Sequence, residues 1–331
     1  MTIKDIAKLS GTSVATVSRV INNNSNVRKD LKQKVLSVIK ETNYIPNTMG
    51  RNLRKSKSEM ILVMLPTLSN PFYSKILKGI EERASELGYG ILLTVTHLQW
   101  KTEKKYLEML QTKQVDGVIS LFSKLSINEI NELAKVYPFV QCCEYTEGAA
   151  LPYVMIDNEK AAYSAVKYFI SHGHKKIGMI SGSFYENSES SREKGYRNAL
   201  IDAGLPFDER YIFKSNYTPE NGMEICEKLL KLKEPPTAIL AVSDTLAIGA
   251  IKYLKTINIK VGEEIEVIGF DNASITKVYD PSVSTVSQPR YDLGTVSVDL
   301  LMDKINDLSV VNKGIILPFE LILRDSTRRD L

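Results

Sequence analysis

Apolar side chains in residues 1–45 recur every three or four positions, which is the spacing of one face of a helix. The pattern predicts three short helices, over residues 3–9, 14–21 and 31–42. Gly11 ends the first helix, and Thr12 and Ser13 offer an N-cap for the second. Two short helices joined by a turn that contains glycine form a helix-turn-helix. The positions that we expect to pack inward are Ile3, Ile6, Ala7 and Leu9 in the first helix, Val17, Val20 and Ile21 in the second, and Leu31, Val35, Leu36, Val38 and Ile39 in the third.

The outward side of the second helix carries small or hydrogen-bonding side chains, without the Glu and Lys that usually solvate a helix. Short side chains let a helix lie deep in the major groove of DNA, where hydroxyls donate to phosphates and an arginine pairs with a guanine edge. A solvated helix face is the alternative interpretation, but the absence of Glu and Lys favours contact with DNA. The outward positions are Ser13, Ala15, Thr16, Ser18, Arg19 and Asn22.

A basic segment follows Pro46, which ends the third helix. Residues 49–55 can form a helix with one apolar face and three cations, although a helix of this length is not stable alone in water. It would fold against the minor groove, with Leu53 as an apolar wedge between base steps. A flexible basic linker is the other interpretation, and the local sequence leaves both open.

From residue 60 onward, short apolar runs alternate with amphipathic stretches. Repeated strand–helix units predict parallel sheets with helices on both faces. Because about 270 residues exceed the size of a typical single core, we expect two such sheets and therefore two lobes. The expected strands are 60–65, 90–95, 117–121, 139–142, 153–156, 176–180, 237–241 and 264–268, and the expected helices are 72–87, 102–112, 127–137, 160–171, 192–203, 218–231 and 245–256.

Polar residues gather where these strands end, and ligands of such folds bind at the carboxyl ends of strands. Carboxylates accept hydrogen bonds from paired hydroxyls, an arginine donates them and aromatic rings stack, so the set suits a ligand with several hydroxyls. Asn70 followed by Pro71 also fits a simple turn, and Asp244 is better explained as a helix cap. Phe72 fits either the core or a pocket wall, and Tyr217 fits either stacking or a surface loop. The candidates are Asn70, Phe72, Tyr73, Asp157, Arg192, Tyr217, Ser243 and Asp271.

Charge is divided unevenly along the chain. Residues 1–60 carry 12 Lys and Arg against 4 Asp and Glu, whereas the remaining residues carry 31 against 35. A cationic end on a mildly anionic body is typical of a nucleic-acid-binding module attached to another domain.

Signatures of an enzyme, a metal site or a membrane protein are missing from the sequence. It has no phosphate-cradling glycine loop, zinc-binding helix motif or nucleophile elbow, so we expect no catalysis, cofactor or metal. The pair His172 and His174 lies in a turn without further metal ligands. Three cysteines without metal-ligand spacing, the absence of an export signal and the absence of a long apolar run predict a cytoplasmic protein.

Several motifs together resemble the LacI/GalR family of bacterial transcriptional regulators, over nearly the whole chain. Where that family has alanine before the basic residue of its hinge helix, this chain has Gly50, which lowers helix propensity by about 1 kcal/mol. Folding of the hinge would therefore depend more on DNA. The motifs include Thr2-Ile3-Lys4-Asp5-Ile6-Ala7, Ser13-Val14-Ala15-Thr16-Val17-Ser18-Arg19, Tyr44-Ile45-Pro46-Asn47, Ser69-Asn70-Pro71-Phe72, Gly269-Phe270-Asp271-Asn272 and Ser287-Gln288-Pro289-Arg290-Tyr291.

The resemblance implies a core like the periplasmic sugar-binding proteins, in which the chain crosses between two lobes three times. It implies a helix-turn-helix domain at 1–46, a hinge helix and linker at 47–58, and an effector-binding and dimerisation domain at 59–331. Lobe 1 would comprise about 59–157 and 288–318, and lobe 2 about 158–287 and 319–331.

It also implies a repressor that binds a pseudopalindromic operator as a homodimer and responds to a sugar, sugar phosphate or nucleoside. A dimer is expected because no leucine-rich tail follows the core. A catabolite-control-type regulator gated by a phosphocarrier protein is the alternative. By the resemblance Val14, Ala15 and Arg19 read bases and Leu53 enters the minor groove. The remaining candidates are Thr2, Lys4, Asn47, Gly50, Arg51 and Arg54 for DNA, and Gln288 for the effector.

Overall fold

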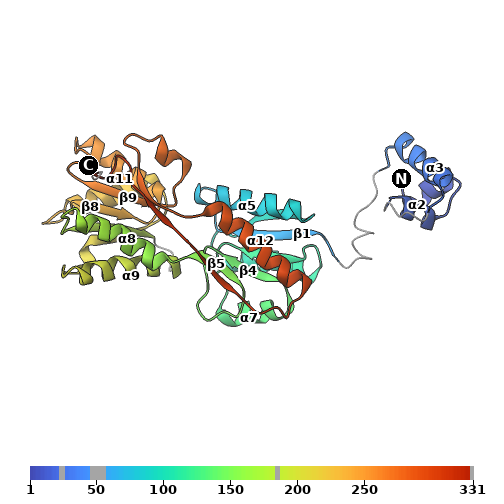
Figure 1. Ribbon diagram of the computed structural model, residues 1–331, viewed down its shortest axis with the longest axis horizontal. Helices are drawn as coiled ribbons and strands as arrows, with labels where there is room; N and C mark the ends of the chain where they lie inside the picture. Colours follow the sequence, from blue (N-terminus) through green and yellow to red (C-terminus); the bar gives the residue numbers. More distant parts are fainter. Residues whose placement is uncertain (22–26, 45–56, 183–186, 329–331) are drawn as a thin grey trace. The chain divides into compact units, whose positions relative to one another are not determined.

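The computed structural model describes residues 1–21, 27–44, 57–182 and 187–328. The chain divides into two compact units, residues 1–58 and residues 59–331 (Figure 1). Each unit has a hydrophobic core of its own.

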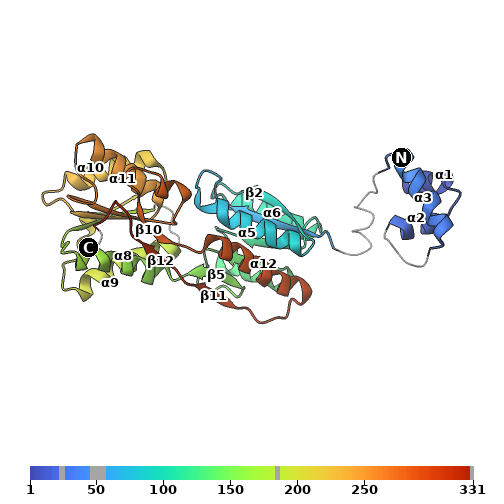
Figure 2. The same cartoon turned by 45° about the horizontal axis from the view of Figure 1, so that its top comes forward.

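The described part of the first unit contains three helices, α1 (Ile3–Leu9), α2 (Val14–Ile21) and α3 (Lys29–Glu41) (Figure 2). Its core contains one fully buried residue from each helix, namely Ile6, Val17 and Val35. Thr2 begins α1 with a capping box, because its hydroxyl accepts from the backbone N–H of Asp5 while the Asp5 carboxylate accepts from the backbone of Thr2. Gly11 turns the chain between α1 and α2 with a φ of +64°, which favours glycine. The helix-turn-helix is confirmed.

Two apolar positions of the predicted helical stripes are not buried. Leu9 is 59% exposed and Leu36 is 46% exposed. Leu36 follows the buried Val35 directly, so it points about 100° away around α3 from the buried side of the helix. The prediction that both leucines pack inward was therefore wrong.

The second unit contains two six-stranded sheets, as the alternation of strands and helices predicted. The first, in the order β11-β5-β4-β3-β1-β2, carries four helices and forms lobe 1. The second, in the order β12-β10-β9-β8-β6-β7, carries four helices and forms lobe 2. Every strand pair is parallel except β10 with β12. Lobe 1 comprises β1 (Met60–Leu65), α5 (Phe72–Glu86), β2 (Gly90–Val95), α6 (Trp100–Gln111), β3 (Gly117–Ser120), α7 (Ile127–Val136), β4 (Phe139–Cys142), β5 (Tyr153–Ile156), α12 (Arg290–Asn306) and β11 (Gly314–Leu317). Lobe 2 comprises α8 (Asn158–Ser171), β6 (Ile177–Gly182), α9 (Asn187–Asp202), η1 (Glu209–Tyr211), β7 (Ile212–Ser215), α10 (Pro219–Leu230), β8 (Ala238–Ala241), α11 (Asp244–Thr256), β9 (Glu266–Phe270), η2 (Ser274–Lys277), β10 (Ser284–Ser287) and β12 (Glu320–Ile322).

Strand β1 shows why the strands of lobe 1 read as continuous apolar runs. Ile61 and Val63 belong to a core cluster that also includes Ile76 of α5, whereas Leu62 belongs to a separate cluster with Leu107 of α6. A parallel sheet covered on both faces has no solvent side, so the polar alternation of a half-buried strand is absent.

Five strands and helices were missing from the predicted alternation, which ended at residue 268: β7, β10, α12, β11 and β12. Strand β10 reads Ser-Thr-Val-Ser, which lacks an apolar run, yet Ser284 and Thr285 are fully buried. Their hydroxyls are paired, Ser284 with the Thr327 hydroxyl at 2.7 Å and Thr285 with the Asp244 carboxylate at 2.6 Å. Hydrogen bonding to distant residues therefore replaces the hydrophobic signal that sequence patterns depend on.

The chain crosses between the lobes three times, after β5, after β10 and after β11. The last crossing is visible in Figure 1 as the extended segment near the C-terminus that passes from β11 to β12. The same two lobes are therefore joined at three points along the chain.

Helices α5 and α12 lie side by side on lobe 1 and contact each other through their backbones (Figure 2). A Cβ on Gly79 would lie 2.2 Å from the carbonyl oxygen of Tyr291, and a Cβ on Gly294 would lie 2.3 Å from that of Ile76. Real Cβ atoms do not approach backbone so closely, so both positions require glycine.

We expect Gly79→Ala and Gly294→Ala to destabilise lobe 1, each by about 1–3 kcal/mol, because the added methyl group overpacks the helix pair. The measurement is urea unfolding of the full chain. Ser85→Ala, on the exposed side of α5, serves as the control and should stay within about 0.5 kcal/mol of the parent. Equal stability of the Gly294→Ala variant and the parent would contradict the backbone contact.

Candidate functional site

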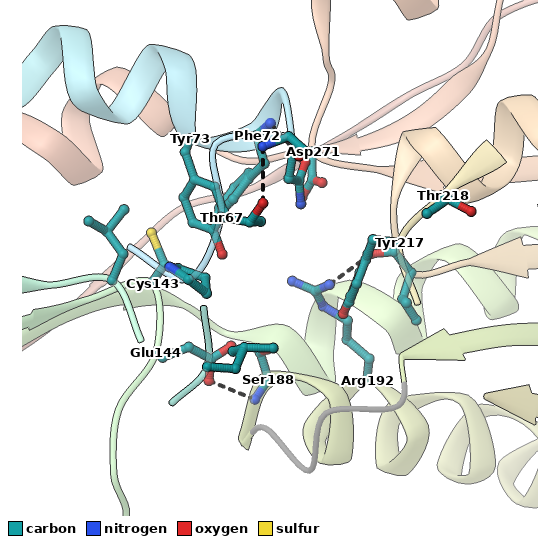
Figure 3. Close-up of a pocket in the computed structure, with 16 residues that line it drawn as sticks. Thr67, Phe72, Tyr73, Cys143, Glu144, Ser188, Arg192, Tyr217, Thr218 and Asp271 are labelled. Carbon is teal, nitrogen blue, oxygen red and sulfur yellow. Dashed lines mark hydrogen bonds between the residues drawn. The ribbon is translucent and has the colours of Figure 1, made fainter. Parts of the chain in front are cut away.

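A cavity of about 280 Å³ lies between the lobes, at the carboxyl ends of the strands of both sheets (Figure 3). Every residue that lines it follows the end of a strand, β1 to β4 in lobe 1 and β6 to β9 in lobe 2. Its size and its mixed polar and apolar wall suit a small organic ligand. The lining residues are Pro66, Thr67, Ser69, Asn70, Phe72, Tyr73, Leu98, Leu121, Cys143 and Glu144 from lobe 1, and Ser188, Arg192, Tyr217, Thr218, Val242 and Asp271 from lobe 2.

Arg192 of α9 is 7% exposed, and its guanidinium points into the cavity (Figure 3). Its Nε donates to Oδ1 of Asn158 at 3.0 Å, and Nη1 donates to the carbonyl oxygen of Val242 at 2.8 Å. The guanidinium also lies over the ring of Phe270, 3.9 Å from its centroid, in a cation–π contact. The start of α8 and the ends of β8 and β9 therefore hold this side chain in one orientation.

Asp271 lies directly after β9, with a φ of +106° that places its carboxylate at the cavity wall. Its Oδ1 accepts from Nε2 of Gln288 at 2.8 Å. Burial raises the pKa of Asp271 to about 6, while the positive charges of Arg192 and Arg290 and the hydrogen bond from Gln288 act to lower it. The carboxylate is thus an acceptor for ligand hydroxyls near neutral pH, held in place by one amide.

Glu144 is a cavity residue that the sequence did not reveal. It follows β4 in lobe 1, and its carboxylate accepts from the hydroxyl and the backbone N–H of Ser188 in lobe 2. Asn187 also donates from its side chain to the backbone carbonyl of Tyr145. These hydrogen bonds connect the lobes directly across the cleft. Burial raises the pKa of Glu144, and the hydrogen bonds from Ser188 and the charge of Arg192 oppose that shift.

Four further predicted residues line the cavity: Asn70, Phe72, Tyr73 and Tyr217. Oδ1 of Asn70 accepts from the backbone N–H of Phe72 at 3.0 Å, so Asn70 forms a turn and also contacts the cavity. Phe72 is 8% exposed and belongs to both the core of lobe 1 and the cavity wall. The Tyr217 hydroxyl donates to Glu189, which holds the ring at the rim.

Three predicted ligand contacts do not line the cavity. Asp157 is exposed and caps α8, accepting from the backbone N–H of Lys160 at 2.9 Å, while its neighbour Asn158 orients Arg192. Ser243 caps α11, and Gln288 supports Asp271 from behind. After a strand, residues that cap a helix or support another side chain are adjacent in sequence to residues that contact a ligand. The sequence pattern alone therefore does not distinguish these roles.

Asp244 is not the helix cap that the sequence favoured, since Ser243 has that role. Its carboxylate accepts from the backbone N–H of Ala273 and from the hydroxyl of Thr285, each at 2.6 Å. It therefore fixes the loop that carries Asp271.

The candidate DNA-contacting face of the first unit is the outer side of α2. Ser13, Ala15 and Arg19 are exposed, Val14 is 38% exposed, and α2 has no acidic residue in its first turn. The Ser13 hydroxyl caps α2 by accepting from the backbone N–H of Thr16 at 3.1 Å. Of the other predicted contacts, Lys4 and Thr2 are exposed and Thr16 and Ser18 are half-buried, whereas Asn22, Asn47, Gly50, Arg51, Leu53 and Arg54 lie outside the described residues.

Residues 1–21, 27–44, 57–182 and 187–328 contain no cluster of His, Cys, Asp and Glu that could hold a metal ion. His174 is instead buried between the Thr237 hydroxyl at 2.8 Å and the Glu266 carboxylate at 3.0 Å. Among the described helices, none combines the length and apolar character that a membrane span requires.

Comparison with known proteins gives two family matches. Residues 2–47 match the model of bacterial regulatory proteins of the lacI family, and residues 58–324 match that of periplasmic binding proteins and the sugar-binding domain of the LacI family.

Three similar proteins span almost the whole chain. The HTH-type transcriptional repressor CytR of Escherichia coli (strain K12) is 38% identical over 99% of this chain and 96% of its own length. Catabolite control protein A of Priestia megaterium is 36% identical over 99% of each. The Lac repressor dimer bound to operator and the anti-inducer ONPF superposes with a TM-score of 0.90 at 25% identity, covering 99% of each chain.

The raised pKa of Asp271 predicts a stability cost in the ligand-free protein. Its pKa is about 6 in the folded chain and 3.8 ordinarily, so stability falls as pH rises from about 4 to above 6 and the carboxylate ionises. We expect Asp271→Asn, which keeps the acceptor for Gln288, to raise stability at pH 7.5 by about 1–3 kcal/mol.

Thermal unfolding from pH 4 to pH 8 measures this effect. The difference between Asp271→Asn and the parent should be small at pH 4 and largest above pH 6. A difference that does not change with pH would contradict the burial of an ionised carboxylate at this position.

Proposed function

Because the chain belongs to the LacI family of bacterial transcriptional regulators, we propose that it represses an operon for carbohydrate or nucleoside use, under control of a small effector between its lobes. Like its relatives, it is a DNA-binding regulator and not an enzyme. We assign residues 1–46 to DNA binding, 47–58 to a hinge helix and linker, and 59–331 to effector binding and dimerisation.

The observation that carries this proposal is the composition of the cavity wall. Asn70, Phe72 and Glu144 come from lobe 1, whereas Arg192 and Asp271 come from lobe 2. A ligand that contacts both sets has its best contacts at one separation of the lobes, so its binding favours that separation. The hydrogen bonds of Glu144 with Ser188 also connect the lobes, and they do so without a ligand.

The DNA side of the proposal depends on the outer face of α2. Ala15 and Arg19 are exposed there, where an arginine can pair with a guanine edge in the major groove. A homodimer would place two such helices on the half-sites of a pseudopalindromic operator. Because the protein would bind operator DNA, we propose that it is cytoplasmic. A change in lobe separation would change the spacing of the two hinges, and typical coupling of about 1–3 kcal/mol changes operator affinity about 5- to 150-fold.

A second candidate is a catabolite-control-type regulator gated by a phosphocarrier protein in place of a small molecule. The 36% identity to Catabolite control protein A favours it. The oriented guanidinium of Arg192 in a cavity between the lobes favours a small ligand instead, because a protein that docks on the outer surface would not contact it. Failure of the purified chain to form a complex with the phosphocarrier would remove this candidate.

The test of the proposed function measures operator affinity with and without effector. Thermal shift against sugars, sugar phosphates and nucleosides identifies a ligand, and fluorescence anisotropy with DNA from the chain's own promoter region measures affinity. We expect the ligand to change operator affinity about 5- to 150-fold. An affinity that no bound ligand changes would rule out effector control.

Arg19→Ala is the control for the DNA face, since it removes a cation from α2. The free energy of operator binding should become less favourable by about 1–3 kcal/mol, while ligand affinity stays unchanged. Lys260→Ala removes a cation from the surface of lobe 2 and should leave operator affinity unchanged.

A further inference from the structure

The described residues that line the cavity carry more acidic groups than basic ones. Among the described residues that line it, three are charged: Glu144, Arg192 and Asp271. Figure 3 shows the guanidinium of Arg192 between the side chains of the other two. A ligand in this cavity therefore meets two carboxylates and one cation.

The one cation is already paired with protein groups. Two of the donors of Arg192 are engaged by Asn158 and by the carbonyl of Val242, and its face lies against Phe270. Its charge also acts to lower the pKa values of Glu144 and Asp271, which burial raises. Two carboxylates thus share one guanidinium, and no excess positive charge remains for an anion.

Other cations near the cavity are also engaged. Arg290 lies behind Asp271, where Nη2 donates to the carbonyl of Asn272 at 2.7 Å and Nη1 to that of Pro71 at 3.4 Å. Lys214 pairs with Glu193 at 2.7 Å.

Backbone N–H groups, which also bind phosphates, are occupied at the edge of the cavity. The N–H of Phe72, at the start of α5, donates to Asn70. The N–H and hydroxyl of Ser188, in the first turn of α9, donate to the carboxylate of Glu144. The carboxylate of Glu144 therefore occupies the donors of Ser188 that could otherwise bind a phosphate.

We infer that the cleft takes an uncharged polyhydroxy ligand, a free sugar or a nucleoside, and that Glu144 excludes the phosphorylated form of the same compound. Hydroxyls can donate to the carboxylate of Asp271 and accept from Arg192. A phosphoryl group carries about −1.5 to −2 charge at neutral pH and would lie beside two carboxylates that already share the one guanidinium. The inference rests on the proposed effector site and narrows its ligand class.

Isothermal titration of the full chain with matched pairs tests this. The pairs are ribose and ribose 5-phosphate, glucose and glucose 6-phosphate, and cytidine, uridine, adenosine and guanosine with their 5′-monophosphates. We expect the neutral member of at least one pair to bind, on the order of 100-fold more tightly than its phosphorylated partner, because like charges side by side are strongly unfavourable.

Variants identify the residue that discriminates. Glu144→Gln keeps an acceptor for Ser188 but removes the charge. It should reduce the ratio of the affinities of the neutral compound and its phosphorylated partner by about 10-fold or more. Glu147→Gln, an exposed glutamate on the same loop, removes a charge outside the cavity and should leave the difference unchanged.

A phosphorylated compound that binds as tightly as its neutral partner, or more tightly, would overturn the inference. So would a panel in which no neutral compound binds, or a Glu144→Gln variant with unaltered discrimination. A neutral compound that binds without changing operator affinity would instead refute the proposed function and leave the ligand class standing.

Discussion

A buried guanidinium needs partners, and Arg192 has three in lobe 2, one at the start of α8 and two at the ends of β8 and β9. Asn158 begins the first helix after the crossing from lobe 1, Val242 follows β8, and Phe270 ends β9. These contacts depend on the parallel order of the sheet, because only that order brings the ends of β6, β8 and β9 to one edge. The cavity is therefore organised around one side chain before any ligand arrives.

The carboxylates on either side of this guanidinium belong to different lobes. Glu144 approaches from lobe 1 and Asp271 from lobe 2, so the electrostatics of the cleft depend on how closely the lobes approach. On the crossing side, Arg290 at the start of α12 donates to Pro71 in lobe 1 and to Asn272 in lobe 2. Because α12 packs against α5 through glycine, this arginine connects the loop after β9 with the helix pair of lobe 1.

Much of the fold follows from the sequence, because both sheets are buried on both faces and their strands stand out as apolar runs. The candidate site was predicted in part for the same reason. Asn70, Phe72, Tyr217 and Asp271 come next to strand ends or open the helix that follows, and they line the cavity. Arg192 also lines it, although it lies inside α9 and does not open that helix as the sequence suggested.

What the sequence missed has physical causes. Glu144 lies in a loop whose length and course no pattern fixes, so its meeting with Ser188 of the other lobe depends on tertiary structure. The roles of Asp157 and Asn158 depend on which of two adjacent side chains faces the cleft, and helix capping decided that. Strand β10 was missed because buried hydroxyls paired with Asp244 and Thr327 replace its apolar residues.

The central claim is that an oriented guanidinium, and not merely a positive charge, makes the ligand site. Arg192→Lys keeps the charge but cannot bridge Asn158 and Val242 while lying flat on Phe270. Titration calorimetry of this variant with the effector tests the claim most directly, with the far-UV circular dichroism of the same sample to establish its fold. The account predicts a loss of affinity on the order of 100-fold, whereas affinity within a few-fold of the parent would contradict it.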